Sequence, residues 1–208
     1  VTLRAQLSAG GGALAGQRVL VTRSRSQAST LVELLRAEGA TPIELPAIEV
    51  ERRADHAEVG RVVTALRERT YGWVVFTSAI AIDVFLDLLT EHQTDTRVFA
   101  DARICAIGDA TARVLRQRGL IADLVATDAS SEGVLAAMGS EQLDGTSILL
   151  PRAEGAREAL PGGLRAAGAN VDELTLYLAA PPAEPPAEAL ALVREGKIDT
   201  VTFTSSST

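Results

Sequence analysis

The chain has 208 residues, enough for one large domain or two small ones. Hydrophobic residues make up 47% of it and charged residues 23%, a composition typical of ordinary globular proteins. The net charge of −7 argues against nucleic acid as a partner, because phosphate recognition needs clustered lysine and arginine. No apolar run reaches the ~18 residues that a membrane span needs, and no signal-peptide pattern is visible. We therefore expect a cytoplasmic protein with no membrane partner.

The beginning of the chain predicts a flexible segment, then one strand and one helix. Residues 1–16 contain three consecutive glycines and suggest a leader, or a linker from an upstream domain. Residues 18–21 predict a buried strand, and the helix that follows ends at Gly39. Its apolar face consists of Leu31, Leu34 and Leu35. Residues 43–50 predict an extended segment, which Pro46 restricts to an edge or crossing position.

The middle of the chain alternates strands and helices, the pattern of an α/β protein. Short apolar runs predict strands at residues 73–76, 103–107 and 124–126. Helical patterns cover about residues 55–69 and 81–90. Two more predicted helices follow: one ends at Arg118 and the other ends near Met138. Ser130 or Ser131 is the predicted N-cap of the last of these helices.

The few residues that could carry redox or metal chemistry lie in unpromising surroundings. The single cysteine, Cys105, excludes an intrachain disulfide and a cysteine-rich metal site. Its apolar neighbours predict a small buried hydrophobe in preference to a nucleophile. His56 and His92 lie in polar stretches, and we expect both to be solvated surface residues. The sequence therefore predicts no metal and no cofactor.

Residues 148–177 predict one strand–helix–strand unit. The apolar run 148–150 breaks at the polar loop 151–155, a helix follows over about residues 156–167, and Gly168 ends it before a second strand.

This unit repeats the start of the chain. Residues 19–23 match residues 148–152 at an offset of 129, and the same offset aligns Glu44 with Glu173. A second match, of residues 74–78 with residues 201–205, has an offset of 127. Two matches at nearly one offset predict an internal duplication, with two similar α/β halves.

Two proline pairs, at residues 181–182 and 185–186, predict a boundary between compact units. A helix over about residues 188–195 and a strand over residues 200–203 then begin a new α/β segment. By comparison with the first half, we expect that roughly 50 to 60 residues of a complete unit are missing after it.

Small polar or basic residues recur where the predicted strands end. Ligands of open α/β sheets bind beyond the carboxyl ends of the strands, where helix N-termini favour carboxylates or phosphates. The alternative role of such hydroxyls is helix capping. The recurrence of the pattern in both halves favours anion binding for the set, which comprises Arg23, Thr77, Ser78, Gly108, Thr111, Thr204, Ser205 and Ser206.

Fingerprints of common enzymes are missing from the sequence. There is no Walker-type lysine loop, no glycine-rich dinucleotide motif after a strand, and no apparent Ser-His-Asp set. Anion-binding strand ends without an obvious nucleophile fit a cofactor-free reaction that holds a polyanionic substrate in a chosen shape.

Seven motifs in order resemble those of the uroporphyrinogen-III synthase family. They are VLVTR at 19–23, IELPAIEV at 43–50, VVFTSA at 74–79, AIGDATA at 106–112, SEG at 131–133, LLPRAEGAREAL at 149–160 and VTFTSSST at 201–208. Each motif is weak alone, but the series covers essentially residues 17–208.

The resemblance implies a fold of two similar doubly wound parallel-sheet domains joined by a two-stranded crossing ladder. The first domain would combine residues 17–49 with residues 180–208, and its C-terminal part would be missing. The second domain would span residues 50–179. Residues 43–50 and 174–179 would be the crossing strands.

The resemblance also implies an activity: a hydro-lyase that converts hydroxymethylbilane to uroporphyrinogen III, with loss of water and inversion of the last pyrrole ring. Tyr177 matches the tyrosine that assists departure of the hydroxyl, although an amphipathic hinge residue is an alternative role. The substrate carries eight carboxylates, so attraction to a chain of net charge −7 must be local, from Arg23, Arg152 and Arg157. The matched motifs add Ser131 and Gly155 to the substrate site.

Two alternatives remain open. The chain could be a non-catalytic, two-lobed regulatory module that binds anions or tetrapyrroles, or one domain of a longer protein that carries another tetrapyrrole activity. For the enzyme, we expect a monomer that receives its substrate from hydroxymethylbilane synthase.

Overall fold

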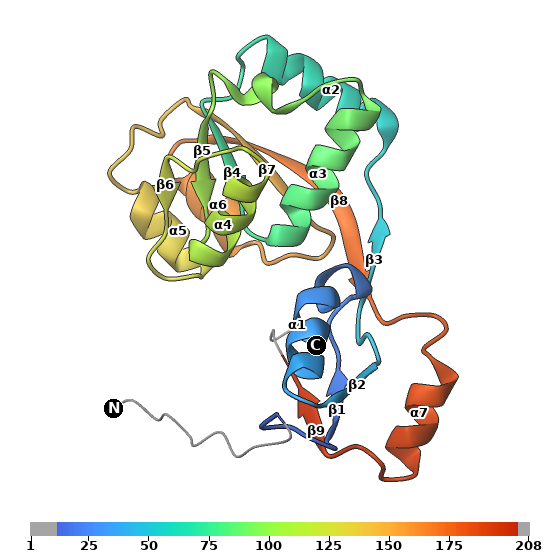
Figure 1. Cartoon of the computed structure of the whole chain (residues 1–208). Coiled ribbons are helices and arrows are strands. Elements are labelled where there is room, and N and C mark those ends of the chain that lie inside the picture. The colour runs from blue at the N-terminus through green and yellow to red at the C-terminus, as the bar shows by residue number, and fades with distance from the viewer. Residues whose placement is uncertain (1–11, 204–208) are drawn as a thin grey trace. The chain divides into compact units, whose positions relative to one another are not determined.

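The computed structural model describes residues 12–203, and the chain divides into two compact units (Figure 1). Unit 1 comprises Val1–Val50 and Ala179–Thr208, and unit 2 comprises Glu51–Leu178. Within the described residues, no helix is both long and apolar enough to cross a membrane.

Unit 1 contains a three-stranded sheet in the order β2-β1-β9, with β1 parallel to both neighbours. Its elements are β1 (Arg18–Val21), α1 (Arg25–Ala37), β2 (Thr41–Glu44), α7 (Ala187–Arg194) and β9 (Thr200–Thr202). A small core joins Val21 to Ala28 and Val32 of α1. The sequence predicts Leu34 on the apolar face of this helix, but Leu34 is 61% exposed. Because an α-helix has 3.6 residues per turn, Leu34 lies on a different face of the helix from Ala28 and Val32.

The extended segment predicted over residues 43–50 is divided in the structure. Its first residues belong to β2, and only its end belongs to β3 (Glu49–Arg52), which pairs with β8 (Asn170–Ala180). The pairing of β2 with β1 ends before Pro46, which has no N–H to donate. The N–H of Ala47 donates instead to the carbonyl of Thr22, the residue after β1, at 2.9 Å.

Unit 2 contains a six-stranded sheet in the order β3-β8-β7-β4-β5-β6, and the pairings from β8 to β6 are parallel. Its remaining strands are β4 (Trp73–Phe76), β5 (Arg103–Ala106), β6 (Leu124–Val125) and β7 (Ser147–Ala153). Its helices are α2 (His56–Arg67), α3 (Ala79–Glu91), α4 (Asp109–Gln117), α5 (Ser131–Met138) and α6 (Ala159–Ala166), with a 3-10 turn at Thr96–Phe99. The predicted α/β class with parallel sheets is confirmed.

The strand order reverses direction at β4. From β4 the chain proceeds through β5 to β6, whereas β7 and β8 lie on the other side of β4 (Figure 1). Among the helices that follow these strands, α3 contacts α4 and α5 contacts α6. The gap between the carboxyl ends of β4 and β7 is therefore the switch point where ligands of such sheets bind.

Buried side chains on the strands of unit 2 pack against α5 and α6. This core joins Trp73, Cys105, Ile148 and Leu150 to Leu164 of α6. Cys105 is fully buried, as predicted, and burial raises the pKa of its thiol to about 12. Aromatic rings of α3 and its surroundings form a second cluster, in which Phe76, Phe85 and Phe99 lie 6.0–6.5 Å apart.

The sequence predicts a strand break at Pro151, but β7 continues to Ala153. The pairing of β7 with β4 ends at Leu149, and Pro151 pairs only with Leu174 of β8. A proline is tolerated where one side of a strand needs no donor. As a result, Arg152 belongs to the strand and not to the loop, and α6 begins later than predicted.

The structure shows the predicted repetition. The series β1, α1, β2 has the same order as β7, α6, β8, and the first strands begin 129 positions apart, at Arg18 and Ser147. Gly39 and Gly168 follow the two helices with φ of 85° and 89°, a left-handed conformation that ends helices and favours glycine.

His56 is exposed, as the sequence predicts, whereas His92 is only partly exposed. The two rings stack with centroids 4.0 Å apart. The Nε2 atom of His92 is buried without a hydrogen-bond partner among residues 12–203.

Candidate active site

The carboxyl edge of the unit 2 sheet collects several helix N-termini. Ser78 precedes α3 and its Oγ accepts a hydrogen bond from the Ala81 N–H at 3.0 Å. Ser130 precedes α5 and accepts from the Gly133 N–H at 3.0 Å. Capping therefore accounts for both hydroxyls, and the choice left open between Ser130 and Ser131 falls to Ser130. Helix N-termini also carry positive potential, which suits a carboxylate.

A pocket of about 170 Å³ opens at this edge. It lies at the switch point, because Thr77 follows β4 and Arg152 ends the buried part of β7. Ser131 of α5 and Arg157, from the loop before α6, complete its polar lining. The structure thus brings together four residues that the sequence predicts for the substrate site.

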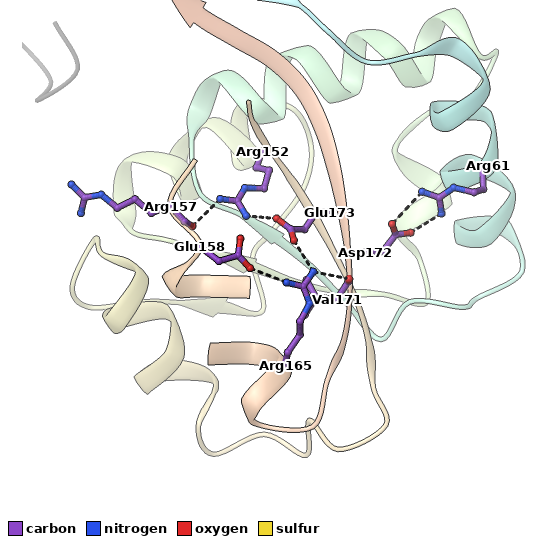
Figure 2. Close-up of polar contacts among 8 residues, drawn as sticks. All are labelled: Arg61, Arg152, Arg157, Glu158, Arg165, Val171, Asp172 and Glu173. Carbon is purple, nitrogen blue, oxygen red and sulfur yellow. Dashed lines mark hydrogen bonds and ion pairs between the residues drawn. The ribbon is translucent and has the colours of Figure 1, made fainter. Parts of the chain in front are cut away.

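Arg152 is buried in this pocket, with a side chain that is 7% exposed. Its Nη1 donates to the carboxylate of Glu173 on β8, and its Nη2 donates to the Arg157 backbone carbonyl at 2.8 Å (Figure 2). The second oxygen of Glu173 accepts from Arg165 of α6 at 2.6 Å. Arg165 in turn reaches Glu158 at 3.0 Å. Positive and negative groups therefore alternate along a chain of four side chains.

Arg157 has a different environment. Its side chain is exposed, and within residues 12–203 its guanidinium makes no ion pair. Figure 2 shows it pointing away from the cluster around Glu173. Arg157 is therefore the cation of this pocket whose charge is available to a ligand.

Tyr177 lies at the same edge and is 4% exposed. Its hydroxyl and the Ser78 Oγ are 3.0 Å apart, and either can donate. A register shift in β8 places Tyr177 opposite Ala153, so that one extra residue redirects the side chain. Burial raises the pKa of Tyr177, and the hydrogen bond with Ser78 lowers it only in part. The phenol is thus protonated at neutral pH.

Other predicted site residues do not line the pocket. Gly108 precedes α4, Thr111 is buried within α4, and Gly155 lies in an exposed loop with φ of 69°. Arg23 follows β1 in unit 1, and its Nε atom is buried without a hydrogen-bond partner among the described residues. Thr204, Ser205 and Ser206 lie outside the described residues.

The sequence reasoning missed Glu173 and the apolar side of the pocket. Glu173 is a charged residue in a mostly apolar strand, and such a residue needs a counter-charge. The need for a counter-charge could have drawn attention to Glu173, but it does not identify Arg152 as the partner. The apolar lining consists of Ile107, Leu150, Ala156 and Leu160.

No three His, Cys, Asp or Glu side chains cluster as metal ligands in the part of the chain that the structure describes. The site instead offers hydroxyls, helix N-termini and one available guanidinium at the switch point of a parallel sheet. These features of the α/β fold suit the binding of an anion at the carboxyl edge of the sheet.

Residues 29–208 match the model of the family described as "Uroporphyrinogen-III synthase HemD". The chain belongs to the uroporphyrinogen-III synthase family. It is 34% identical over 187 residues to a putative uroporphyrinogen-III synthase of Methanothermobacter thermautotrophicus, covering 89% of this chain and 72% of that protein. It is 30% identical over 196 residues to the uroporphyrinogen-III synthase of Synechococcus elongatus, covering 94% and 73%.

A third relative is longer. The porphyrin biosynthesis protein HemD of Ruminiclostridium josui is 33% identical over 197 residues, which are 94% of this chain but 38% of that protein.

Solved structures agree on the fold. A mutant uroporphyrinogen III synthase from Thermus thermophilus matches with a TM-score of 0.61 and 22% identity, covering 89% of this chain and 71% of that chain. The synthetase from Helicobacter pylori matches with a TM-score of 0.52 and 16% identity, covering 85% and 68%.

Proposed function

We propose that this protein is a uroporphyrinogen-III synthase, a hydro-lyase that closes hydroxymethylbilane to uroporphyrinogen III while inverting the last pyrrole ring. Family membership and the names of the relatives support the reaction. The observation that carries the site assignment is the pocket at the switch point of unit 2, with its available guanidinium.

The pocket is suited to one acidic side chain of the substrate. A volume of about 170 Å³ is well below the several hundred Å³ of pockets that enclose whole ligands. The Arg157 guanidinium pairs with a substrate carboxylate, and the hydroxyls of Thr77 and Ser131 donate hydrogen bonds to it. The apolar lining packs against the carbon atoms of the same side chain.

Other carboxylates bind elsewhere. Arg23 is a second binding residue in this proposal, because a buried guanidinium nitrogen without a partner is costly until an acceptor arrives. Gly108, Thr111 and Gly155 keep their predicted substrate-binding roles. The same role is proposed from the sequence alone for Thr204, Ser205 and Ser206.

Tyr177 supplies acid assistance. Its hydroxyl gives a proton to the leaving hydroxyl of the substrate, which departs as water, and the resulting cation closes the ring. The raised pKa makes the tyrosinate short-lived, so it recovers the proton that ring closure releases. The net reaction then loses water alone. Ser78 keeps the phenol in place and can accept or donate as the proton moves.

The remaining parts of the proposal concern the surroundings of the enzyme. It acts in the cytoplasm as a monomer without a cofactor, and it receives hydroxymethylbilane from hydroxymethylbilane synthase. We take the two compact units as its two domains.

A coupled assay tests this function. Natural full-length protein is incubated with porphobilinogen and hydroxymethylbilane synthase, and the oxidised products are separated into uroporphyrin I and III. The proposal predicts isomer III in excess. Isomer I alone from folded protein would contradict it and leave a non-catalytic binding module.

A further inference from the structure

Arg152 has its charge compensated within the protein. Its side chain is 7% exposed, and a charge buried to that degree is strongly destabilising unless it is paired. Glu173 provides the counter-charge, and the Arg157 carbonyl occupies the other terminal nitrogen at 2.8 Å. A substrate carboxylate near Arg152 would also meet the negative charge of Glu173.

Glu173 is itself held from two sides. One oxygen binds Arg152 of β7 and the other binds Arg165 of α6, so the carboxylate fixes the strand to the helix (Figure 2). Its side chain is 26% exposed, and both of its oxygens have guanidinium partners. This arrangement fixes Arg152 in one orientation, because a planar guanidinium has directional donors.

The repeat in unit 1 shows that this pairing is specific to unit 2. Arg23 and Glu44 occupy the positions that correspond to Arg152 and Glu173 at the offset of 129. Glu44 is exposed, and Arg23 makes no ion pair within the described residues. The strand–helix–strand geometry therefore does not require the pair.

We infer that Glu173 and Arg152 are positioning residues for the substrate-binding guanidinium of Arg157. Glu173 orients Arg152, and Arg152 holds the backbone carbonyl of Arg157, which fixes where the loop presents the Arg157 side chain at the pocket. The inference rests on the proposed function and deepens it: one substrate carboxylate binds Arg157, while Arg152 acts through the main chain.

The test compares two glutamate substitutions of equal chemistry. Glu173→Gln removes the charge that orients Arg152. Glu141→Gln is the matched control, since Glu141 is 23% exposed and also binds an arginine, Arg103, through both oxygens. That pair lies at the start of β5, away from the pocket. Arg152→Lys is a second test variant, because an ammonium cannot hold Glu173 and the Arg157 carbonyl in the same planar geometry.

Two measurements on the natural full-length protein are made for each variant. One is the KM and kcat for hydroxymethylbilane, and the other is the Kd for uroporphyrin III, followed by fluorescence. Glu173→Gln and Arg152→Lys are expected to raise both KM and Kd about tenfold, with kcat within about twofold of wild type. Glu141→Gln is expected to leave all three values unchanged.

A double substitution separates positioning from general destabilisation. In an Arg157→Ala background, Glu173→Gln is expected to add less than about twofold to KM, because its effect passes through Arg157. The inference would be overturned if the KM effects of Glu173→Gln and Arg157→Ala multiply in full in the double variant. It would also be overturned if the KM of Glu173→Gln equals that of wild type. If the wild type forms isomer III and the variants match it, only this inference fails. If the wild type neither forms isomer III nor binds uroporphyrin III, the proposed function fails together with it.

Discussion

The two tyrosines of the chain are equally buried, but their hydroxyls have different partners. Tyr71 and Tyr177 are each 4% exposed. Tyr71 precedes β4, at the amino edge of the unit 2 sheet, and its hydroxyl donates to the carboxylate of Asp172. Tyr177 lies at the carboxyl edge, and its partner is the neutral hydroxyl of Ser78. Equal burial therefore does not give the two phenols equal chemistry.

The proton of Tyr71 is committed to a carboxylate. Asp172 also accepts two hydrogen bonds from Arg61, at 2.7 and 3.1 Å. Burial raises the pKa of Tyr71, and the hydrogen bond to Asp172 raises it further. An ionised carboxylate can only accept, so Tyr71 must donate and has no second role. At Tyr177 the partner can accept or donate, which leaves the proton available to a substrate.

Pocket size alone does not identify the site. Two larger pockets, of about 380 and 570 Å³, lie at the amino edge of unit 2, and one of about 600 Å³ lies beside β6 and α5 with acidic but no basic lining residues. The arginines of the two amino-edge pockets are mostly bound to acidic side chains: Arg61 to Asp172, Arg69 to Asp101, Arg97 to Asp95, and Arg165 to Glu158 and Glu173. The small carboxyl-edge pocket contains Arg157, whose charge is not compensated. Available charge, and not volume, distinguishes the candidate site from the amino-edge pockets.

The largest expected effect is at Tyr177. Tyr177→Phe is expected to lower kcat at least ~100-fold, because it removes the proposed acid. Its unfolding free energy should fall by only about 1 kcal/mol, the value of one hydrogen bond. Tyr71→Phe is the control: it removes a hydrogen bond to a carboxylate, so its unfolding free energy should fall by about 2 kcal/mol, with an unchanged kcat. Steady-state kinetics measure kcat, and urea unfolding measures the unfolding free energy. Equal kcat values for the two variants would contradict the proposed difference between Tyr177 and Tyr71.

The next effect concerns stability at the amino edge. Burial pushes the pKa of Asp172 upward, but the hydrogen bonds from Arg61 and Tyr71 outweigh it and hold the pKa below its usual value. Asp172→Asn is expected to lower the unfolding free energy by about 2 kcal/mol at pH 7, the range of a hydrogen-bonded charge. Activity should not change.

The pH dependence of this loss has a definite sign. A depressed folded-state pKa stabilises the protein above the unfolded pKa of about 4, and this stabilisation is lost as the pH falls through the folded pKa. Wild type should therefore lose more stability than Asp172→Asn between about pH 5 and pH 2. Urea unfolding at several pH values measures the difference, and parallel curves for the two proteins would count against the assigned role of Asp172.

Two capping serines test whether the contact with Tyr177 matters for catalysis. Ser78→Ala and Ser130→Ala each remove one N-cap hydrogen bond of 3.0 Å, and each should cost about 1 kcal/mol of stability. Only Ser78 also contacts Tyr177. We expect kcat to fall severalfold for Ser78→Ala and to stay constant for Ser130→Ala. A kcat that is the same in both variants would mean that Ser78 acts as a cap alone.

The smallest effect is expected at Gln93, beside an amino-edge pocket. Gln93 follows the C-cap of α3 with φ of 52°, a conformation that favours glycine. Gln93→Gly is expected to raise the unfolding free energy by about 0.5–1 kcal/mol without a change in activity. Thermal unfolding measures the gain. A loss of activity would show that the amino edge contributes to function.

Local patterns in the sequence predicted the elements that depend on neighbouring residues. Gly39 and Gly168 end helices as expected, and Cys105 is buried as its apolar neighbours indicated. Gln93 and Arg69 end helices in the same left-handed conformation, but neither residue type signals that conformation as glycine does.

Features that depend on distant residues could not be predicted. Pro151 suggested a break, but whether a strand tolerates proline depends on which neighbours it pairs with. The contact of Ser78 with Tyr177 spans 99 positions in the chain, and the ion pair of Arg152 with Glu173 spans 21. The sequence therefore indicated the edge that holds the candidate site, but not which side chains there are free to act.

The most direct test of the difference between the two edges is an NMR titration of tyrosine. Natural full-length protein labelled with ¹³C at the tyrosine Cζ is titrated with uroporphyrin III, and the two signals are assigned with Tyr71→Phe and Tyr177→Phe. If the site lies at the carboxyl edge, the Tyr177 signal shifts as binding saturates while the Tyr71 signal stays in place. A shift of the Tyr71 signal alone, or of neither signal when binding is complete, would contradict the placement of the site at the carboxyl edge.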